Sequence, residues 1–322
     1  MNNIPASGPD EFWWADPNLK QRLTADPLAV LKDRGVNLPA GLPAELVREV
    51  VQITSLLWVN GRVIPREQFF IDPYDDGLLF GRGVWESTRT VGGMPWLWPL
   101  HLDRLVKSAP LLDIAVAPER LPDAKQVYEF VRSLTGQDVI VRLNVTAGRP
   151  GKPGLVWMSA ALRPAPLPSI RLKTLPSPVP KNQPYLLWKT FQYATRLLVT
   201  QQAMKAGYDS TLLVDPEGNV LEAAHANVFV RLEDGWATPP FDGGLLPGTV
   251  RQHLLTHSPI PIREQTVSQA QLAGAAEIFV TNSNVGICPA TQIDDRTYPV
   301  GPETQALIGF VPPVSARGTP AV

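Results

Sequence analysis

The chain of 322 residues contains a single cysteine, Cys288, which excludes a disulfide within the chain. Such a sequence suits a reducing compartment, and we expect a cytoplasmic protein. Its 29 Lys+Arg and 30 Asp+Glu leave no basic excess of the kind that nucleic-acid-binding proteins carry. No apolar run approaches the length of a membrane span, and the polar, proline-rich N-terminus lacks the pattern of a signal peptide. We therefore expect neither a nucleic acid nor a membrane as a partner.

Sequence motifs for several common chemistries are also missing. The histidines at positions 101, 225, 253 and 257 form no metal-binding pattern with other ligands, so we expect no metal site. Gly81-Arg82-Gly83 lacks the third glycine of a dinucleotide fingerprint, and the chain has no P-loop. No serine stands in the context of a nucleophile elbow. These absences disfavour metal, dinucleotide and serine-nucleophile chemistry.

Proline, in contrast, is abundant, with 34 residues, and many of them mark connectors. The proline-rich run near 163–169 separates two regions and is the natural linker between domains. We expect the following division: an N-terminal extension at 1–54, a small α+β domain at 55–163, a linker at 164–169, a large domain at 170–310 and a tail at 311–322.

Both expected domains mix helical and strand patterns. Leu57–Ile64 consists of two β-rich runs around Asn60-Gly61, which predicts a hairpin. Apolar spacing and turn residues predict the other elements. Further strands are expected at 84–90, 138–147, 155–162, 211–214, 227–231 and 277–281, and helices at 26–31, 43–51, 100–112, 190–206, 249–255 and 267–273. The fold class is therefore α+β or α/β.

Lys189 is the residue around which the candidate chemistry is arranged. It follows the apolar run Tyr185–Trp188 and precedes a helical pattern that ends at Gly207. A lysine in such a sequence either extends its stem to water or is held as an amine in a pocket. Burial lowers the pKa of a lysine, so a pocket would let Lys189 act as a base near neutral pH.

Several motifs downstream of Lys189 supply partners for such an amine. They are Glu222, Asn227 within Ala226–Phe229, the turn at 248–250 and Ser283. A buried lysine, a carboxylate and small-residue turns that can hold a phosphate are the components of a pyridoxal phosphate site.

These ordered blocks, from about Leu57 to Ile293, resemble the fold-type IV pyridoxal phosphate enzymes. That family includes branched-chain aminotransferases, D-amino acid transaminases and 4-amino-4-deoxychorismate lyases. The resemblance implies a small α+β domain and a larger pseudo-barrel domain, here with an N-terminal helical extension. It also implies pyridoxal 5'-phosphate as the cofactor, a small-molecule amine or amino acid as the substrate, and a homodimer.

The resemblance further implies a role for each matched residue. Lys189 corresponds to the Schiff-base and proton-transfer lysine, and Glu222 to the carboxylate that pairs with the pyridine nitrogen. Tyr193 corresponds to the tyrosine beside the cofactor ring oxygen, and helical spacing would put it on the face of Lys189. Asn227 is either a direct contact or a strand-end cap. The residues matched to phosphate binding are Arg89, Gly248, Thr249, Val250 and Ser283, where many relatives have threonine in place of Val250.

The choice of reaction depends on shorter motifs. Branched-chain enzymes usually follow the lysine with Ala-Gly-Gly-Asn-Tyr, whereas this chain has Thr190-Phe191-Gln192-Tyr193. D-amino acid transaminases commonly carry Val-Thr-Arg-Gly, where this chain has Val145-Thr146-Ala147-Gly148 and an arginine only at Arg149. Arg142–Gly148 and Thr281–Ser283 are more similar to aminodeoxychorismate lyases. We therefore favour a lyase that eliminates pyruvate to give 4-aminobenzoate, with a class IV aminotransferase and a non-catalytic binding protein as alternatives.

Overall fold

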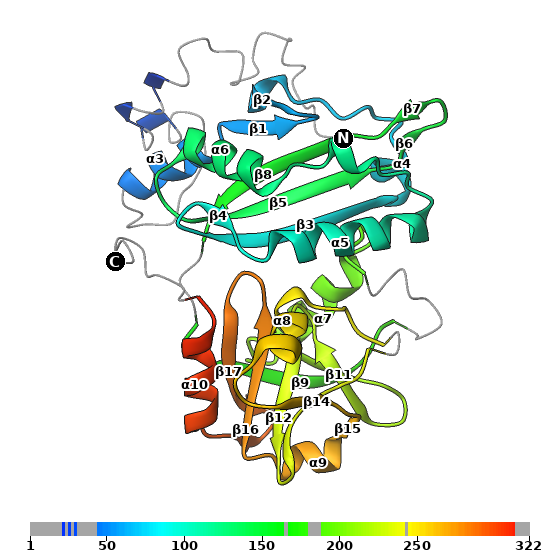
Figure 1. The fold of residues 1–322 in the computed structure, drawn as a ribbon, viewed down its shortest axis with the longest axis vertical. Helices are drawn as coiled ribbons and strands as arrows, with labels where there is room; N and C mark the ends of the chain where they lie inside the picture. Colours follow the sequence, from blue (N-terminus) through cyan, green and yellow to red (C-terminus); the bar gives the residue numbers. More distant parts are fainter. Residues whose placement is uncertain are drawn as a thin grey trace, which may run out of the picture.

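The computed structural model describes residues 21–22, 25–26, 29–30, 44–163, 167–179, 188–241 and 244–312. Two lobes follow one another along the long axis of the molecule (Figure 1). The upper lobe contains a six-stranded sheet and the lower lobe a ten-stranded sheet that curls into a half-barrel. The expected mixed fold with a small and a large domain is thereby confirmed. Within the described ranges, no helix is both long enough and apolar enough to cross a membrane.

The small domain is built on an antiparallel sheet with the order β2-β1-β8-β5-β3-β4. The predicted hairpin is present, and Asn60 and Gly61 turn it with φ values of 47° and 90°. Left-handed values at both positions match the twist of the flanking strands. The strands are β1 (Leu56–Val59), β2 (Arg62–Pro65), β3 (Gly83–Val91), β4 (Met94–Pro95), β5 (Val139–Thr146) and β8 (Val156–Leu162), with the separate hairpin β6 (Gly148–Arg149) and β7 (Lys152–Pro153).

Two helices complete the core of the small domain. Leu105 and Phe130 are 0% and 1% exposed within one apolar cluster. Helix α6 begins with a capping box in which Asp123 and Gln126 bond to each other's backbone N–H. The helices are α4 (Asp76–Phe80), α5 (Trp98–Ser108) and α6 (Ala124–Leu134), with 3-10 turns at Arg66–Gln68, Ala109–Leu112 and Pro118–Arg120.

The expected N-terminal extension contributes one described helix, α3 (Ala44–Ile53). It packs against β8, and Ile53 is 0% exposed within the small-domain core. The helix predicted at 43–51 is therefore present, and its end belongs to that core. Parts of the helix predicted at 26–31, of the linker and of the tail lie outside the described residues. The domain boundaries remain predictions.

The large domain holds strands in the order β14-β13-β12-β16-β17-β9-β10-β11-β15, with β18 beside β17. Most pairs are antiparallel, but β9 runs parallel to both β10 and β17, and β13 runs parallel to β14. Nearly every residue of β10, β12 and β16 is buried, because the half-barrel encloses one apolar cluster and helices cover another. The strands are β9 (Ile170–Pro176), β10 (Ser210–Val214), β11 (Asn219–Ala223), β12 (Asn227–Leu232), β13 (Gly235–Thr238), β14 (Ile262–Glu264), β15 (Val267–Ser268), β16 (Glu277–Asn282), β17 (Gly286–Ile293) and β18 (Arg296–Thr297).

The helices of this domain are α7 (Ala194–Lys205), α8 (Thr249–His257), α9 (Gln269–Ala273) and α10 (Pro302–Phe310). The helices predicted at 190–206 and 267–273 start later than expected. Val267 and Ser268 pair with β11 before α9 begins. Likewise, Thr190 bridges to Val84 of β3 before α7 begins. In both cases tertiary pairing replaces the first helical turn.

The pairing of Thr190 with β3 is part of a set of hydrogen bonds along the edge of β3 that faces the large domain. Trp85 N–H donates to the Lys189 carbonyl at 2.8 Å, and Phe191 N–H donates to the Gly83 carbonyl at 2.8 Å. The Ser283 hydroxyl donates to the Ser87 carbonyl at 2.6 Å. The backbone groups of β3 that β5 leaves unpaired therefore bond to the large domain, and they hold the segment around Lys189 at the junction of the two lobes.

Candidate active site

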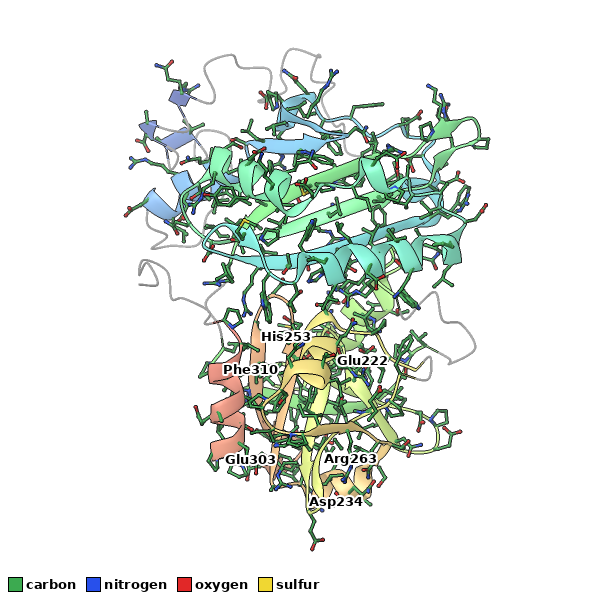
Figure 2. The ribbon with its side chains drawn as sticks, viewed as in Figure 1. Glu222, Asp234, His253, Arg263, Glu303 and Phe310 are labelled. Atoms are coloured by element: carbon green, nitrogen blue, oxygen red, sulfur yellow. The ribbon has the colours of Figure 1, made fainter. Side chains whose placement is uncertain are left out.

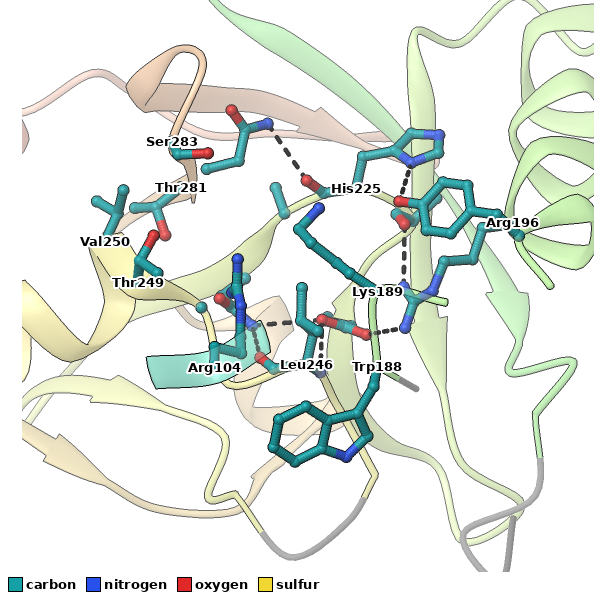
Figure 3. Close-up of a pocket in the computed structure, with 17 residues that line it drawn as sticks. Arg104, Trp188, Lys189, Arg196, His225, Leu246, Thr249, Val250, Thr281 and Ser283 are labelled. Atoms are coloured by element: carbon teal, nitrogen blue, oxygen red, sulfur yellow. Dashed lines mark hydrogen bonds and ion pairs between the residues drawn. The ribbon is translucent and has the colours of Figure 1, made fainter. Parts of the chain in front are cut away.

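A pocket with about 460 Å³ of empty space lies at this junction. Arg104 of α5 reaches it from the small domain, and the large domain supplies the other lining residues. Figure 3 shows Lys189 between a group with Thr249 and Ser283 on one side and a group with Arg196 and His225 on the other. Every predicted site residue except Arg89 lines it: Lys189, Tyr193, Glu222, Asn227, Gly248, Thr249, Val250 and Ser283.

Lys189 lies in a bend of the chain before α7 rather than on a helix. Its Nζ is 4.0 Å from the ring centroid of Trp85. Burial of the amine, and then the positive charge of Arg104, lower the pKa of Lys189 to about 7. A substantial fraction of this amine is neutral at pH 7, so it can accept a proton there. Because α7 begins at Ala194, the expectation that Tyr193 shares a helical face with Lys189 is wrong.

Glu222, on β11, is 2% exposed and fully engaged by three donors. Arg196 Nη2 donates to Oε1 at 2.6 Å, Leu246 N–H to Oε2 at 3.1 Å and Asn227 Nδ2 to Oε2 at 3.3 Å. Burial raises the pKa of Glu222, and Arg196 opposes that rise. Asn227 also donates to the Leu246 carbonyl at 2.9 Å, so it connects the carboxylate to the next turn.

The predicted phosphate turn leads directly into α8. Gly248 precedes the first helical residue, Thr249, and a Cβ at Gly248 would lie 1.9 Å from Asn227 Oδ1. A larger residue here would displace the Asn227 amide from its bonds to Glu222 and Leu246, so the close approach favours glycine. The first N–H groups of a helix have no partner within it and attract anions. Val250, 1% exposed, packs in an apolar cluster with Phe229, and this environment suits the apolar side chain of a valine.

Arg89, the predicted phosphate ligand outside the pocket lining, is 0% exposed on β3. Its guanidinium lies 4.1 Å from the centroid of Trp96, and Nη2 donates to the Pro312 carbonyl at 2.7 Å. Among the described residues, its Nε and Nη1 have no acceptor. A Cβ at Gly286 would come within 2.9 Å of Nη1, so the glycine keeps that side open. Buried donors without acceptors suit an anion such as a phosphate.

Sequence reasoning missed the network beneath the phosphate turn. Arg104 donates to Glu86 twice, at 2.7 and 2.6 Å, and to the Pro247 carbonyl at 2.9 Å. Burial opposes ionisation of Glu86, but Arg104 and His101 bring the pKa of Glu86 down to about 2. His101 Nδ1 lies 2.6 Å from Glu86 Oε2, and its Nε2 lies 3.3 Å from the Thr249 hydroxyl. His101 therefore also supports the turn.

Two further residues escaped the sequence reading. Arg196 pairs with Glu222, and His225 lies 2.9 Å from the Tyr193 hydroxyl. The sequence did offer a signal that His225 lies near the site, because His225 stands between the predicted site residues Glu222 and Asn227. By contrast, Asp234, Arg263 and Glu303 lie toward the far end of the large domain from Glu222 (Figure 2).

Residues 83–293 match the sequence model of the family described as Amino-transferase class IV. This chain belongs to that family. A Methanocaldococcus jannaschii protein described as a candidate branched-chain-amino-acid aminotransferase is 29% identical over 74% of this chain and 88% of its own. D-alanine aminotransferase of Bacillus licheniformis is 26% identical, over 75% and 89%. Aminodeoxychorismate lyase of Bacillus subtilis is 25% identical, over 76% and 88%.

Solved structures show the same fold. A branched-chain aminotransferase from Thermoproteus uzoniensis has a TM-score of 0.72 at 24% identity, over 79% of this chain and 92% of its own. A pyridoxal phosphate-bound hypothetical aminotransferase from Mycobacterium tuberculosis has a TM-score of 0.71 at 21% identity, over 79% and 96%. The protein is therefore a pyridoxal phosphate-dependent enzyme, so the predictions of an enzyme of this kind and of its cofactor are confirmed. These comparisons support the aminotransferase alternative better than the lyase that the sequence favoured.

Proposed function

We propose that this enzyme is an aminotransferase that moves an amino group between an amino acid and a keto acid. The observation that carries the proposal is the meeting, in one pocket, of Lys189 with a pKa near 7, the buried carboxylate of Glu222 and the phosphate turn at Gly248. The aminotransferases among the relatives support this reaction over the elimination of pyruvate.

The residues present fit pyridoxal phosphate. Arg89, with its unfilled donors, and the turn at 248–250 would hold the phosphate, and Glu222 would lie at the pyridine nitrogen. When bound, the cofactor supplies an aldehyde for the amino group and a ring that accepts electrons. Lys189 would then take the proton from the substrate carbon that bears the nitrogen and return a proton during transfer.

The small domain offers a cation for the substrate carboxylate. The guanidinium of Arg142 lies 3.9 Å from the centroid of Trp85, the ring that Lys189 Nζ also approaches. A guanidinium can donate two parallel hydrogen bonds to a carboxylate. We assign Arg142 to this contact, which favours amino acids and keto acids over simple amines.

The reaction is tested by incubating the holoenzyme with a panel of amino acids and measuring keto acid release, beside an assay of pyruvate and 4-aminobenzoate release from aminodeoxychorismate. We expect transamination in the wild type and in Lys205→Ala, an exposed lysine of α7, and none in Lys189→Ala. Release of 4-aminobenzoate without transamination would establish the lyase, the second candidate, which the Arg142–Gly148 pattern and the Bacillus subtilis relative favour.

We also propose that the enzyme is a homodimer. Phe70, Tyr74 and Phe80, around α4, are 71%, 66% and 65% exposed, and Leu198 and Met204 of α7 are 62% and 61% exposed. Large apolar side chains gathered on an exposed surface are typical of association sites. The family resemblance implies that a second copy of the chain covers these exposed side chains.

A further inference from the structure

His225 lies between two hydroxyl groups at the edge of the pocket. Its Nδ1 is 2.9 Å from the Tyr193 hydroxyl, and its Nε2 is 3.0 Å from the Thr200 hydroxyl. The imidazole also stacks on the Tyr193 ring, with centroids 5.6 Å apart and 30° between the planes. His225 follows β11, whereas Tyr193 directly precedes α7 and Thr200 lies in the middle of that helix. Figure 3 shows His225 on the same side of the pocket as Arg196.

The number of hydrogens on each group determines which partner donates in every hydrogen bond of this series. Thr200 has one hydroxyl hydrogen, and its Oγ1 lies 2.9 Å from the Arg196 carbonyl, which can only accept. With that hydrogen used, Thr200 accepts from His225, so His225 carries its proton on Nε2. Nδ1 is then an acceptor, and the Tyr193 hydroxyl donates to it. In this arrangement each polar hydrogen of Tyr193, His225 and Thr200 has an acceptor, and the Tyr193 oxygen can still accept a further hydrogen bond.

The surrounding charges keep this arrangement neutral. Loss of water around the ring, then the charges of Arg196 and Lys189, lower the pKa of His225 to about 4, although the outer edge of the residue is open to solvent. Burial raises the pKa of Tyr193; Arg196, Arg142 and Arg104 oppose that rise, and Glu222 adds to it. Near neutral pH the phenol therefore keeps its hydrogen, and the imidazole does not gain a second one.

We propose that His225 is a positioning residue that binds the hydroxyl hydrogen of Tyr193 and turns the phenol oxygen toward the pocket as an acceptor. A group that meets Tyr193 inside the pocket must then donate a hydrogen. Pyridoxal phosphate has an ionisable ring hydroxyl, and this part of the inference rests on the proposed function. His225 would favour the protonated form of that hydroxyl, because the phenol cannot donate to the ionised form while it is bound to Nδ1.

The tautomer is tested first in the apoprotein, by nitrogen NMR of the imidazole rings between pH 6 and 8. The chain has 4 histidines, so the signal that disappears in His225→Phe assigns this ring. We expect the proton on Nε2 in the wild type and a mixture of tautomers in Thr200→Val. Thr256→Val is the matched control, because the Thr256 hydroxyl makes the same bond to a carbonyl four residues back, and Thr256 is far from His225 in the sequence and on a different helix. A proton on Nδ1 in the wild type, or no response to Thr200→Val, would overturn the inference.

The second arm measures the pH midpoint of the visible absorbance change of the holoenzyme. In His225→Phe the freed phenol can donate to the ionised ring oxygen, so we expect the midpoint to fall by about one to two pH units. Thr256→Val should keep the wild-type midpoint, and an unchanged midpoint in His225→Phe would overturn the inference. Absence of a visible band in wild type and variants alike would contradict the proposed function instead, and the apoprotein result would still decide the role of His225.

Discussion

Three cations, Lys189, Arg104 and Arg196, line a pocket in which Glu222 is the carboxylate among the described lining residues. Positive charges near an amine disfavour its protonated form, and burial acts in the same direction. Arg196 is already paired with Glu222 at 2.6 Å, so its charge is partly offset. Arg104 is the charge with the largest effect on Lys189, after burial. The basicity of Lys189 is therefore set jointly by the two domains.

This arrangement predicts how cofactor incorporation depends on pH. Neutral amines attack aldehydes, so the rate at which the apoenzyme reacts with pyridoxal phosphate should rise through about pH 7, the pKa of Lys189, and then level off. Arg104→Gln removes a positive charge and should move that rise to higher pH, by on the order of one unit. Arg104→Lys keeps the charge and should stay close to the wild type. Stopped-flow absorbance gives the rates, and a wild-type rise centred near pH 10 would contradict the assignment.

Single residues also show where sequence reasoning stops. Lys189 and Glu222 could be predicted because their chain neighbours form recognisable blocks. The roles of Arg196 and His225 could not be predicted, because each role depends on a partner 26 or 32 positions away in the sequence. Such hydrogen bonds depend on how the helices and strands pack together, and the local sequence pattern does not reveal this packing.

At the scale of elements, β3 organises the junction between the domains. One of its edges pairs with β5, and the other bonds to the segment around Lys189 and to Ser283. The predicted helix at 190–206 was too long at its start for this reason, because Thr190 and Phe191 pair with β3 instead. The hairpin at 57–64 was predicted correctly, because its turn residues determine it locally.

The exposed apolar side chains of α4 and α7 predict the oligomeric state. We expect the wild type to sediment as a dimer, because Leu198 and Phe80 would otherwise keep large apolar surfaces in water. Leu198→Glu places a charge in the proposed interface and should shift sedimentation velocity profiles toward the monomer at micromolar concentration. Val63→Glu, on β2, is a matched control at a residue that is 45% exposed, and it should leave the profile unchanged. A monomeric wild type would disprove the dimer.

At the scale of the whole molecule, the site exists only where the two domains meet. Trp85, Glu86 and Arg104 come from the small domain, whereas Lys189, Glu222 and the turn at 248–250 come from the large one. The sequence predicted a small and a large domain and eight of the 17 residues that line the pocket, because each block carries a local motif. It did not predict which face of the small domain closes the pocket, because that depends on the docking of β3 and α5.

The central claim is that Lys189 carries pyridoxal phosphate in this pocket. Reduction of the holoenzyme with borohydride fixes the cofactor to its lysine, and mass spectrometry of the peptides then locates it. We predict a pyridoxyl group on the peptide that contains Lys189, and no labelled peptide in Lys189→Ala. Label on Lys173 or Lys205 in the wild type, or an unlabelled protein that nevertheless transaminates, would contradict the account.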